Sequence, residues 1–322
     1  MIQLSHGDNM INQENVEKLF DILDNSASRY YEIMKLPYLE GLVRTCENIL
    51  SNTVEEENEE LKNELFSMIE EIKDIEFNKE EIRKAVQYSC LRGLKHQGIS
   101  NQMITPESIG IFFSYLVEKL YDKGSLLILD PLVGTGNLIT SLANNLNKEL
   151  SLVGVENFIE YYKLSRTLFG MLDYGDNIYY QDILSFNNIS SDLIVTDFSG
   201  IDHQKIFKII KHSFDLIMDS GYMISVIDND FFDNFNLKDF IYEVKDRWHF
   251  FGMIVLPNSI FKNVKKSIFI LQRIGESFVR PEKFLVADLP EFSNEEEMIK
   301  VIKQLNDWFE KIEFYRVREN NE

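Results

Sequence analysis

The sequence predicts an α/β protein: a doubly wound, mostly parallel seven-stranded sheet with an all-α N-terminal domain. Three observations lead to this fold class. Up to about residue 100 the chain carries almost no strand pattern. From Leu126 onward, short apolar runs alternate with stretches of helical periodicity, and a glycine-containing turn follows the first run. Such alternation is typical of a parallel sheet built from right-handed βαβ units.

Four N-terminal segments repeat apolar residues three and four positions apart, which is the period of an amphipathic helix. They cover residues 12–23, 31–50, 57–72 and 79–94, with Asn, Asp or Ser near their starts and Pro37 or glycine between some of them. Polar residues of these types favour helix starts, and proline favours a helix boundary. We therefore expect a helical bundle domain over residues 1–100 and a second domain over residues 101–322.

Seven apolar runs in the second part are rich in β-branched and apolar residues on both faces, as expected of strands in a covered parallel sheet. They lie at residues 126–130, 151–156, 177–181, 192–197, 222–228, 249–257 and 266–274. No long helix separates the last two runs, which permits an antiparallel final strand. A further apolar run at 283–289 and a helix over about 295–311 complete the chain.

The composition indicates a folded protein and argues against a membrane span, a signal peptide and a metal site. The hydrophobic fraction of 44% over 322 residues supports a sizeable buried core. No run approaches the ~20 consecutive apolar residues of a membrane span, and the first residues lack the layout of a signal peptide. We therefore expect a cytoplasmic protein without membrane association. Cys46 and Cys90 stand far apart without a paired Cys or His, so we expect two buried thiols and no metal site.

The formal net charge of -20 bears on nucleic-acid binding. Proteins that bind DNA usually present a basic face to the phosphates. A DNA partner would therefore have to meet a local basic patch or be delivered by a partner subunit. The best basic cluster is Lys262, Lys265 and Lys266 beside Phe261, and an ordinary solvated loop is the alternative interpretation.

A cofactor site is predicted where the first strand enters the sequence DPLVGTGNLITSLANNL, residues 130–146. Glycines in a strand-to-helix turn let backbone amides approach a ligand, and a carboxylate about 20 residues later, Glu156, can accept from ribose hydroxyls. Ile139 replaces the third glycine of a dinucleotide fingerprint, and no Walker lysine is present. Carboxylates at three strand ends, Asp130, Glu156 and Asp182, suit an ammonium group, a ribose and an adenine amino group, which together indicate S-adenosylmethionine. A purely structural turn and another nucleotide are the alternatives.

Three motifs resemble a known family. Asp130 to Asn137 match the Asp-Pro-x-x-Gly-Thr-Gly-Asn motif of N6-adenine DNA methyltransferases, especially the methylation subunits of type I restriction-modification systems. The stretch MITPESIGIFF at 103–113 is similar to that group's Thr-Pro motif, and IVLPNSIFKNVKKSIFILQR at 254–273 to its C-terminal strand region. The match extends to compact bacterial class I methyltransferase-like proteins with a helical N-terminal part.

The resemblance implies a Rossmann-like methyltransferase sheet and S-adenosylmethionine as cofactor. Locally, Thr105 and Pro106 also make sense as the N-cap and first residue of a helix. The cofactor-binding residues that follow from the carboxylates and from the matched motifs are Thr105, Pro106, Asp130, Pro131, Gly134, Gly136, Asn137, Glu156, Asp182 and Asp197.

The catalytic motif of this family departs from its usual form. Where the family carries Asn/Asp-Pro-Pro-aromatic, this chain has Asp197-Phe198-Ser199-Gly200. In one interpretation Asp197 still accepts a hydrogen from the substrate amine and Phe198 offers an aromatic surface for the base. In the other, Asp197 caps a turn and Phe198 belongs to the core.

Three functional hypotheses follow. The leading one is an S-adenosylmethionine-dependent methyltransferase of the N6-adenine type, with Asp197 and Phe198 as catalytic residues. The second is a non-catalytic S-adenosylmethionine-binding protein that acts as a sensor or interaction subunit. A methyltransferase for small molecules or proteins is compatible with the acidity, but no residue points to it.

Overall fold

A computed structural model describes residues 3–4, 11–98, 104–187, 189–234, 237–261, 264–276, 278, 280–281 and 283–319. The chain forms two compact units. Unit 1 comprises Met1–Ile111, Val133–Leu146 and Gly154–Gln181, and unit 2 comprises Phe112–Leu132, Asn147–Val153 and Asp182–Glu322.

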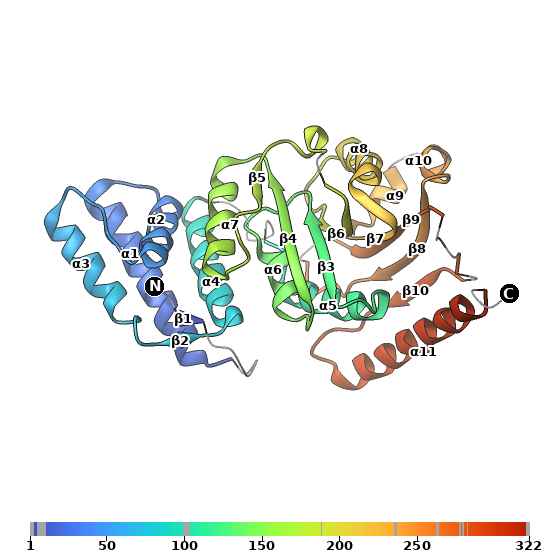
Figure 1. The fold of residues 1–322 in the computed structure, drawn as a ribbon, viewed down its shortest axis with the longest axis horizontal. Coiled ribbons are helices and arrows are strands. Elements are labelled where there is room, and N and C mark those ends of the chain that lie inside the picture. The colour runs from blue at the N-terminus through green and yellow to red at the C-terminus, as the bar shows by residue number, and fades with distance from the viewer. Residues whose placement is uncertain are drawn as a thin grey trace. The chain divides into compact units, whose positions relative to one another are not determined.

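The N-terminal part of unit 1 is helical, as predicted (Figure 1). Its helices are α1 (Gln13–Met34), α2 (Tyr38–Ser51), α3 (Glu59–Glu70) and α4 (Lys79–His96), and the two-residue strands β1 (Gln3–Leu4) and β2 (Glu76–Phe77) pair in parallel. Asparagine side chains cap three of the helices, because Asn12, Asn58 and Asn78 each accept a hydrogen bond from a backbone amide of the first turn.

The helix predicted over residues 31–50 is divided differently in the structure. Residues up to Met34 continue α1, and the break falls at Lys35, whose φ of 57° is left-handed. Pro37 precedes the first residue of α2, where its missing N–H costs no helical hydrogen bond. The apolar periodicity continues across this break, so periodicity alone placed the boundary too early.

The core of unit 1 joins the N-terminal helices to α7 (Ile159–Met171). Leu164, Leu168, Met171 and Leu172 belong to the same buried apolar cluster as residues of α1, α2 and α4. Burial of large aliphatic side chains contributes about 1.5–3 kcal/mol each. The helical region therefore shares one core with α7, the helix that follows Glu156.

Among the described residues, eight strands form one sheet in the order β10-β8-β9-β7-β6-β3-β4-β5. They are β3 (Ser125–Asp130), β4 (Glu149–Glu156), β5 (Ile178–Tyr180), β6 (Ser191–Asp197), β7 (Ile217–Asp228), β8 (Trp248–Val255), β9 (Lys266–Arg273) and β10 (Leu285–Asp288). The predicted α/β class with a mostly parallel sheet is confirmed, with eight strands where seven were expected. The eighth, β10, comes from the apolar run at 283–289 and pairs in parallel with β8.

The predicted antiparallel strand is also present. β9 pairs antiparallel with both β7 and β8. Only residues 256–265 connect β8 and β9, and a parallel pair would need a crossover of a dozen or more residues. The short connection therefore explains the reversal.

Helices connect the parallel strands. α6 (Asn137–Asn144) follows β3, α7 follows β4, and α8 (His203–Ser213) follows β6. The remaining helices are α5 (Glu107–Leu120), α9 (Asp230–Asn234), α10 (Leu237–Val244) and α11 (Glu295–Glu319). None of the described helices is both long enough and apolar enough to span a membrane.

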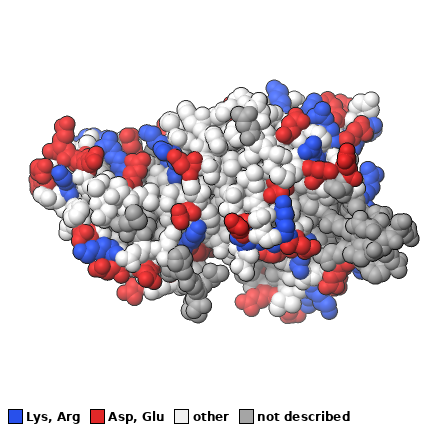
Figure 2. All heavy atoms as spheres, viewed as in Figure 1, with Lys and Arg blue, Asp and Glu red and all other residues white. Residues whose placement is uncertain are grey.

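Charged side chains are mixed in sign on the face shown in Figure 2. Lysine and arginine side chains lie singly or in small groups among acidic ones. The basic cluster named above can be described only in part, because Lys262 lies outside the described residues. Lys266 lies inside the protein rather than on a loop surface, since its side chain is buried.

Candidate functional site

The glycine loop follows β3 and ends where α6 begins. Gly134 has a φ of 54° and Gly136 a φ of 84°, both in the left-handed region that side chains other than glycine rarely adopt. A Cβ on Gly136 would also meet Ser165 and Leu168 of α7 at 3.4 Å. The two predicted glycines are therefore required by the backbone itself, and the Gly136 amide closes the turn by donating to the Val133 carbonyl at 2.8 Å.

Glu156 holds this loop in place. Its Oε2 accepts a hydrogen bond from the Gly134 amide at 2.9 Å, and its Oε1 accepts from the amides of Asn157 and Phe158, each at 2.8 Å. The side chain is 7% exposed. The structure thus brings together two residues predicted from sequence spacing, and Glu156 also anchors the loop, a role that the spacing did not predict.

Aromatic side chains surround the end of β4 and were missed by the sequence prediction. Phe158 is 61% exposed, and its ring lies 6.2 Å from that of Tyr161. Tyr162 and the exposed Tyr180 form a second ring pair with centroids 5.4 Å apart. Exposed aromatic rings beside a carboxylate offer a stacking surface for a planar ligand. The signal in the sequence was the aromatic density of residues 158–162, directly after Glu156.

Thr105 and Asn137 are brought together through a hydrogen bond. The Asn137 side-chain amide donates to the Thr105 carbonyl at 2.7 Å, and its oxygen accepts from Arg83 at 2.6 Å. Arg83, on α4, was not predicted as a site residue. The helix after the Thr-Pro pair begins at Glu107, one residue later than expected, and the Pro106 carbonyl accepts from the Ile109 amide at 3.0 Å.

The other predicted cofactor residues belong to unit 2. Asp130 is buried at the end of β3, and its Oδ1 accepts from the amide of Leu132 at 3.0 Å across Pro131. Asp182 is exposed and caps the short 3-10 helix Ile183–Ser185 by accepting from the Leu184 amide at 2.9 Å. Each carboxylate thus shapes a turn at the end of its own strand.

The Asp197-Phe198-Ser199-Gly200 turn follows β6. Asp197 Oδ1 accepts from the Ser199 amide at 2.9 Å and also contacts the Ser199 hydroxyl. Phe198 is 1% exposed, so its ring lies in the core. A ring that stacks on a base must be exposed, and the ring of Phe198 is not. In this structure Asp197 caps the turn and Phe198 packs in the core.

The buried side chain of Lys266 contacts this turn. The Lys266 ammonium, on β9, contacts the Ser199 hydroxyl and lies 3.2 Å from Asp228 Oδ1. It also lies 4.3 Å from the centre of the Phe261 ring. Asp197, Ser199, Lys266 and Asp228 thus form a continuous polar chain, in which an ammonium contacts the residue that replaces the second proline of the family motif.

Both Cys46 and Cys90 are free and buried, as predicted, and burial raises the pKa of Cys90 to about 12. Within the described part of the chain, no group of three His, Cys, Asp or Glu side chains is arranged to hold a metal ion.

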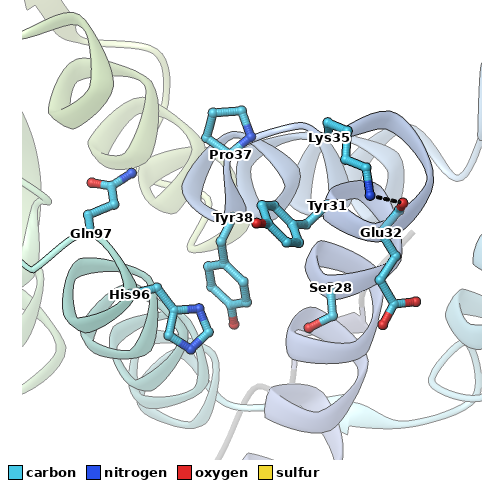
Figure 3. Close-up of a pocket in the computed structure, with 8 residues that line it drawn as sticks. All are labelled: Ser28, Tyr31, Glu32, Lys35, Pro37, Tyr38, His96 and Gln97. Carbon is cyan, nitrogen blue, oxygen red and sulfur yellow. Dashed lines mark hydrogen bonds between the residues drawn. The ribbon is translucent and has the colours of Figure 1, made fainter.

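One cavity, with a volume of about 610 Å³, lies in the helical region (Figure 3). His96 packs edge-on against Tyr38 at 5.4 Å, and the Tyr38 hydroxyl donates to Asp24 at 2.6 Å. The residues that line this cavity are Ser28, Tyr31, Glu32, Lys35, Pro37, Tyr38, His96 and Gln97, and none of them is a predicted site residue.

Comparison with known proteins agrees with this architecture. A family model described as the YtxK N-terminal helical domain matches residues 17–94. The uncharacterized protein YtxK of Bacillus subtilis is 28% identical over 332 residues, covering 93% of this chain and 99% of that protein.

Solved structures extend the comparison to the sheet. A proposed class I S-adenosylmethionine-dependent methyltransferase of Listeria monocytogenes has a TM-score of 0.84 and 26% identity, covering 92% of this chain and all of that one, 100%. A modification subunit of a proposed type I restriction enzyme from Vibrio vulnificus has a TM-score of 0.57 and 17% identity, covering 77% of this chain and 62% of that one. The chain therefore has a methyltransferase fold, and its structural neighbours include methylation subunits of type I restriction-modification systems.

Proposed function

We propose that this protein is an S-adenosylmethionine-dependent methyltransferase that binds its cofactor at the carboxyl end of β4. The observation that carries the proposal is the bond from the Gly134 amide to Glu156, which joins a left-handed glycine loop to a carboxylate. Ligands of α/β folds bind outside the carboxyl ends of the strands, and glycine loops admit them to backbone amides. The Listeria monocytogenes relative, similar over its whole length, supports this choice of cofactor.

The three carboxylates predicted from the sequence, together with Phe158, have roles in this proposal that suit their chemistry. We assign Glu156 to the ribose hydroxyls, because Oε2 receives a single amide and a carboxylate oxygen can accept more than one donor. The exposed ring of Phe158 would stack on the adenine. Asp182 would accept from the adenine amino group, and Asp130 would hold the methionine ammonium. When bound, S-adenosylmethionine supplies an electrophilic methyl group.

Adenine N6 is the acceptor that the sequence motifs favour, and DNA is then the substrate. In this hypothesis Asp197 accepts a hydrogen from the exocyclic amine, whose lone pair must leave conjugation with the ring. The net charge of -20 disfavours DNA binding by this chain alone, so a partner subunit would supply the basic surface.

A second function is favoured by one specific observation. Phe198 is buried and Asp197 is engaged with Ser199, so the corner that would receive a flipped base carries neither an exposed ring nor an acceptor without a partner. A stacking platform contributes about 1–3 kcal/mol per base. A protein that binds S-adenosylmethionine as a sensor or interaction subunit, without methyl transfer, matches this geometry.

Two measurements test these proposals. In titration calorimetry, we expect the intact protein to bind S-adenosylmethionine, and Glu156→Ala or Asp182→Ala to weaken binding by about tenfold or more. Glu160→Ala, an exposed change of the same charge on α7, serves as the control. A lack of binding by the intact protein would refute both functions.

Transfer of a tritiated methyl group to total DNA and RNA separates the two functions. Incorporation that disappears in Asp197→Ala supports the enzyme. Cofactor binding without incorporation into either nucleic acid supports the sensor.

A further inference from the structure

Arg83 lies inside unit 1 with its charge fully enclosed. Its side chain is 0% exposed. A guanidinium has five N–H groups, and the structure gives each of them an acceptor. Nε and Nη2 donate to Glu80 at 2.8 and 2.5 Å, Nη2 also donates to Glu107 at 2.7 Å, and Nη1 donates to Gln87 at 2.9 Å and Asn137 at 2.6 Å. An enclosed charge is tolerated only with such complete pairing.

The contact with Asn137 carries this network to the glycine loop. Asn137 directly follows Gly136, begins α6 and is 5% exposed. Its orientation is determined, because a guanidinium only donates and the Thr105 carbonyl only accepts. The loop is thus held at two points: Gly134 by Glu156, and the residue after Gly136 by Arg83.

The same network holds one whole face of α6. Ser141 donates to the Glu107 carbonyl at 3.3 Å, and Asn144 donates to Glu80 at 2.9 Å. Together with Asn137, these residues recur at helical spacing along one side of the helix. Arg83 bonds both Glu80 and Glu107, so it links α4 to α6 directly and through its two acidic partners.

We propose that Arg83 is a positioning residue for the cofactor loop, through which helix α4 sets the affinity for S-adenosylmethionine. This inference rests on the proposed function. Buried ion pairs add little net stability compared with apolar packing, but removing one partner leaves the other charge buried and unpaired. In this protein the bonds of Arg83 to Asn137 and Glu107 hold the start of α6 against α4. In this inference the N-terminal helical region contributes to cofactor binding by positioning the glycine loop.

Calorimetry on the full chain tests the inference, with Arg83→Met compared with Arg29→Met. Arg29, on α1, is ion-paired with Glu32 and Glu64, each at 2.7 Å, and neither partner belongs to α6. We expect Arg83→Met to weaken binding of S-adenosylmethionine by about tenfold to a hundredfold, and Arg29→Met to change it by less than about threefold. Arg83→Lys, which keeps the charge but loses the planar fork, should give an intermediate loss and serves if Arg83→Met does not fold.

A double-mutant cycle and hydrogen exchange separate positioning from general stability. If Arg83 acts through Asn137, the double variant Arg83→Met/Asn137→Ala should bind no more weakly than the weaker single variant. Without cofactor, amides of residues 134–140 should exchange faster in Arg83→Met than in the wild type, with those of β7 unchanged.

The outcomes are distinguishable. If the wild type binds and folded Arg83→Met binds equally well, or the two losses simply add, the inference is overturned and the proposed function stands. If the wild type does not bind, the proposed function fails and this inference fails with it.

Discussion

The isosteric change Glu156→Gln is the most direct test of the glycine loop as the proposed cofactor site. It preserves the shape of the side chain but replaces one carboxylate oxygen with an NH₂ group, which only donates. Three backbone amides point at this carboxylate, two at Oε1 and one at Oε2. If the glutamine oxygen keeps Asn157 and Phe158, its NH₂ group faces the Gly134 amide, and two donors then oppose each other.

The magnitude follows from the bond that is lost. A hydrogen bond to a charged group is worth about 1.5–3 kcal/mol. Since 1.4 kcal/mol is a factor of ten, the loss corresponds to about tenfold to about 150-fold weaker cofactor binding, if the bound state needs the loop in place. If the glutamine side chain is flipped, its oxygen accepts from the Gly134 amide, but its NH₂ group then faces the amides of Asn157 and Phe158. In either orientation, at least one backbone donor therefore faces another donor.

Titration calorimetry with S-adenosylmethionine and its demethylated product is the assay. Glu160→Gln is the matched control, because it removes one negative charge from an exposed position four residues away. Equal affinities for the wild type and Glu156→Gln would refute the argument. An equal loss in the control would assign the effect to net charge rather than to the loop.

Three further results are expected. Phe198→Ala should lower the free energy of unfolding by about 3–5 kcal/mol in urea denaturation, because the ring is buried; a loss below about 1 kcal/mol would mean that the ring is not a core residue. Phe158→Ala should leave stability nearly unchanged and weaken cofactor binding by about fivefold or more, measured by calorimetry, because an exposed stacking ring is worth about 1–3 kcal/mol. Burial, with Arg280 nearby, lowers the pKa of His249 from 6.5 to about 4. The unfolded state then binds more protons, so stability should fall as the pH drops from 6.5 toward 4. His249→Leu should flatten that slope in acid denaturation, and an unchanged slope would contradict the assignment.

Much of the fold could be predicted because its signals are local. The apolar runs that end at Asp130, Glu156 and Asp197 all became strands of one sheet, since a strand that is buried on both faces can be recognised as a run of consecutive apolar residues. The division at residue 100 into two domains stays a prediction. Gly134 and Glu156 were predicted as residues of one site, because they belong to one strand-turn-helix-strand unit whose geometry recurs among α/β proteins. The hydrogen bond between them was not predicted.

Other parts of the site depend on contacts between distant parts of the chain. Arg83 meets Asn137 across 54 positions, and Lys266 meets Ser199 across 67. No local pattern encodes such contacts, because α4 and β9 follow the same periodicity whichever partner they pack against. The sequence alone determined that carboxylates follow the predicted strands and that Asp197-Phe198-Ser199-Gly200 departs from the motif of the family that the chain resembles. Only the tertiary structure decided that Phe198 is buried, that Lys266 contacts Ser199, and that the N-terminal helices reach the glycine loop, because burial and long-range pairing exist only once the chain is folded.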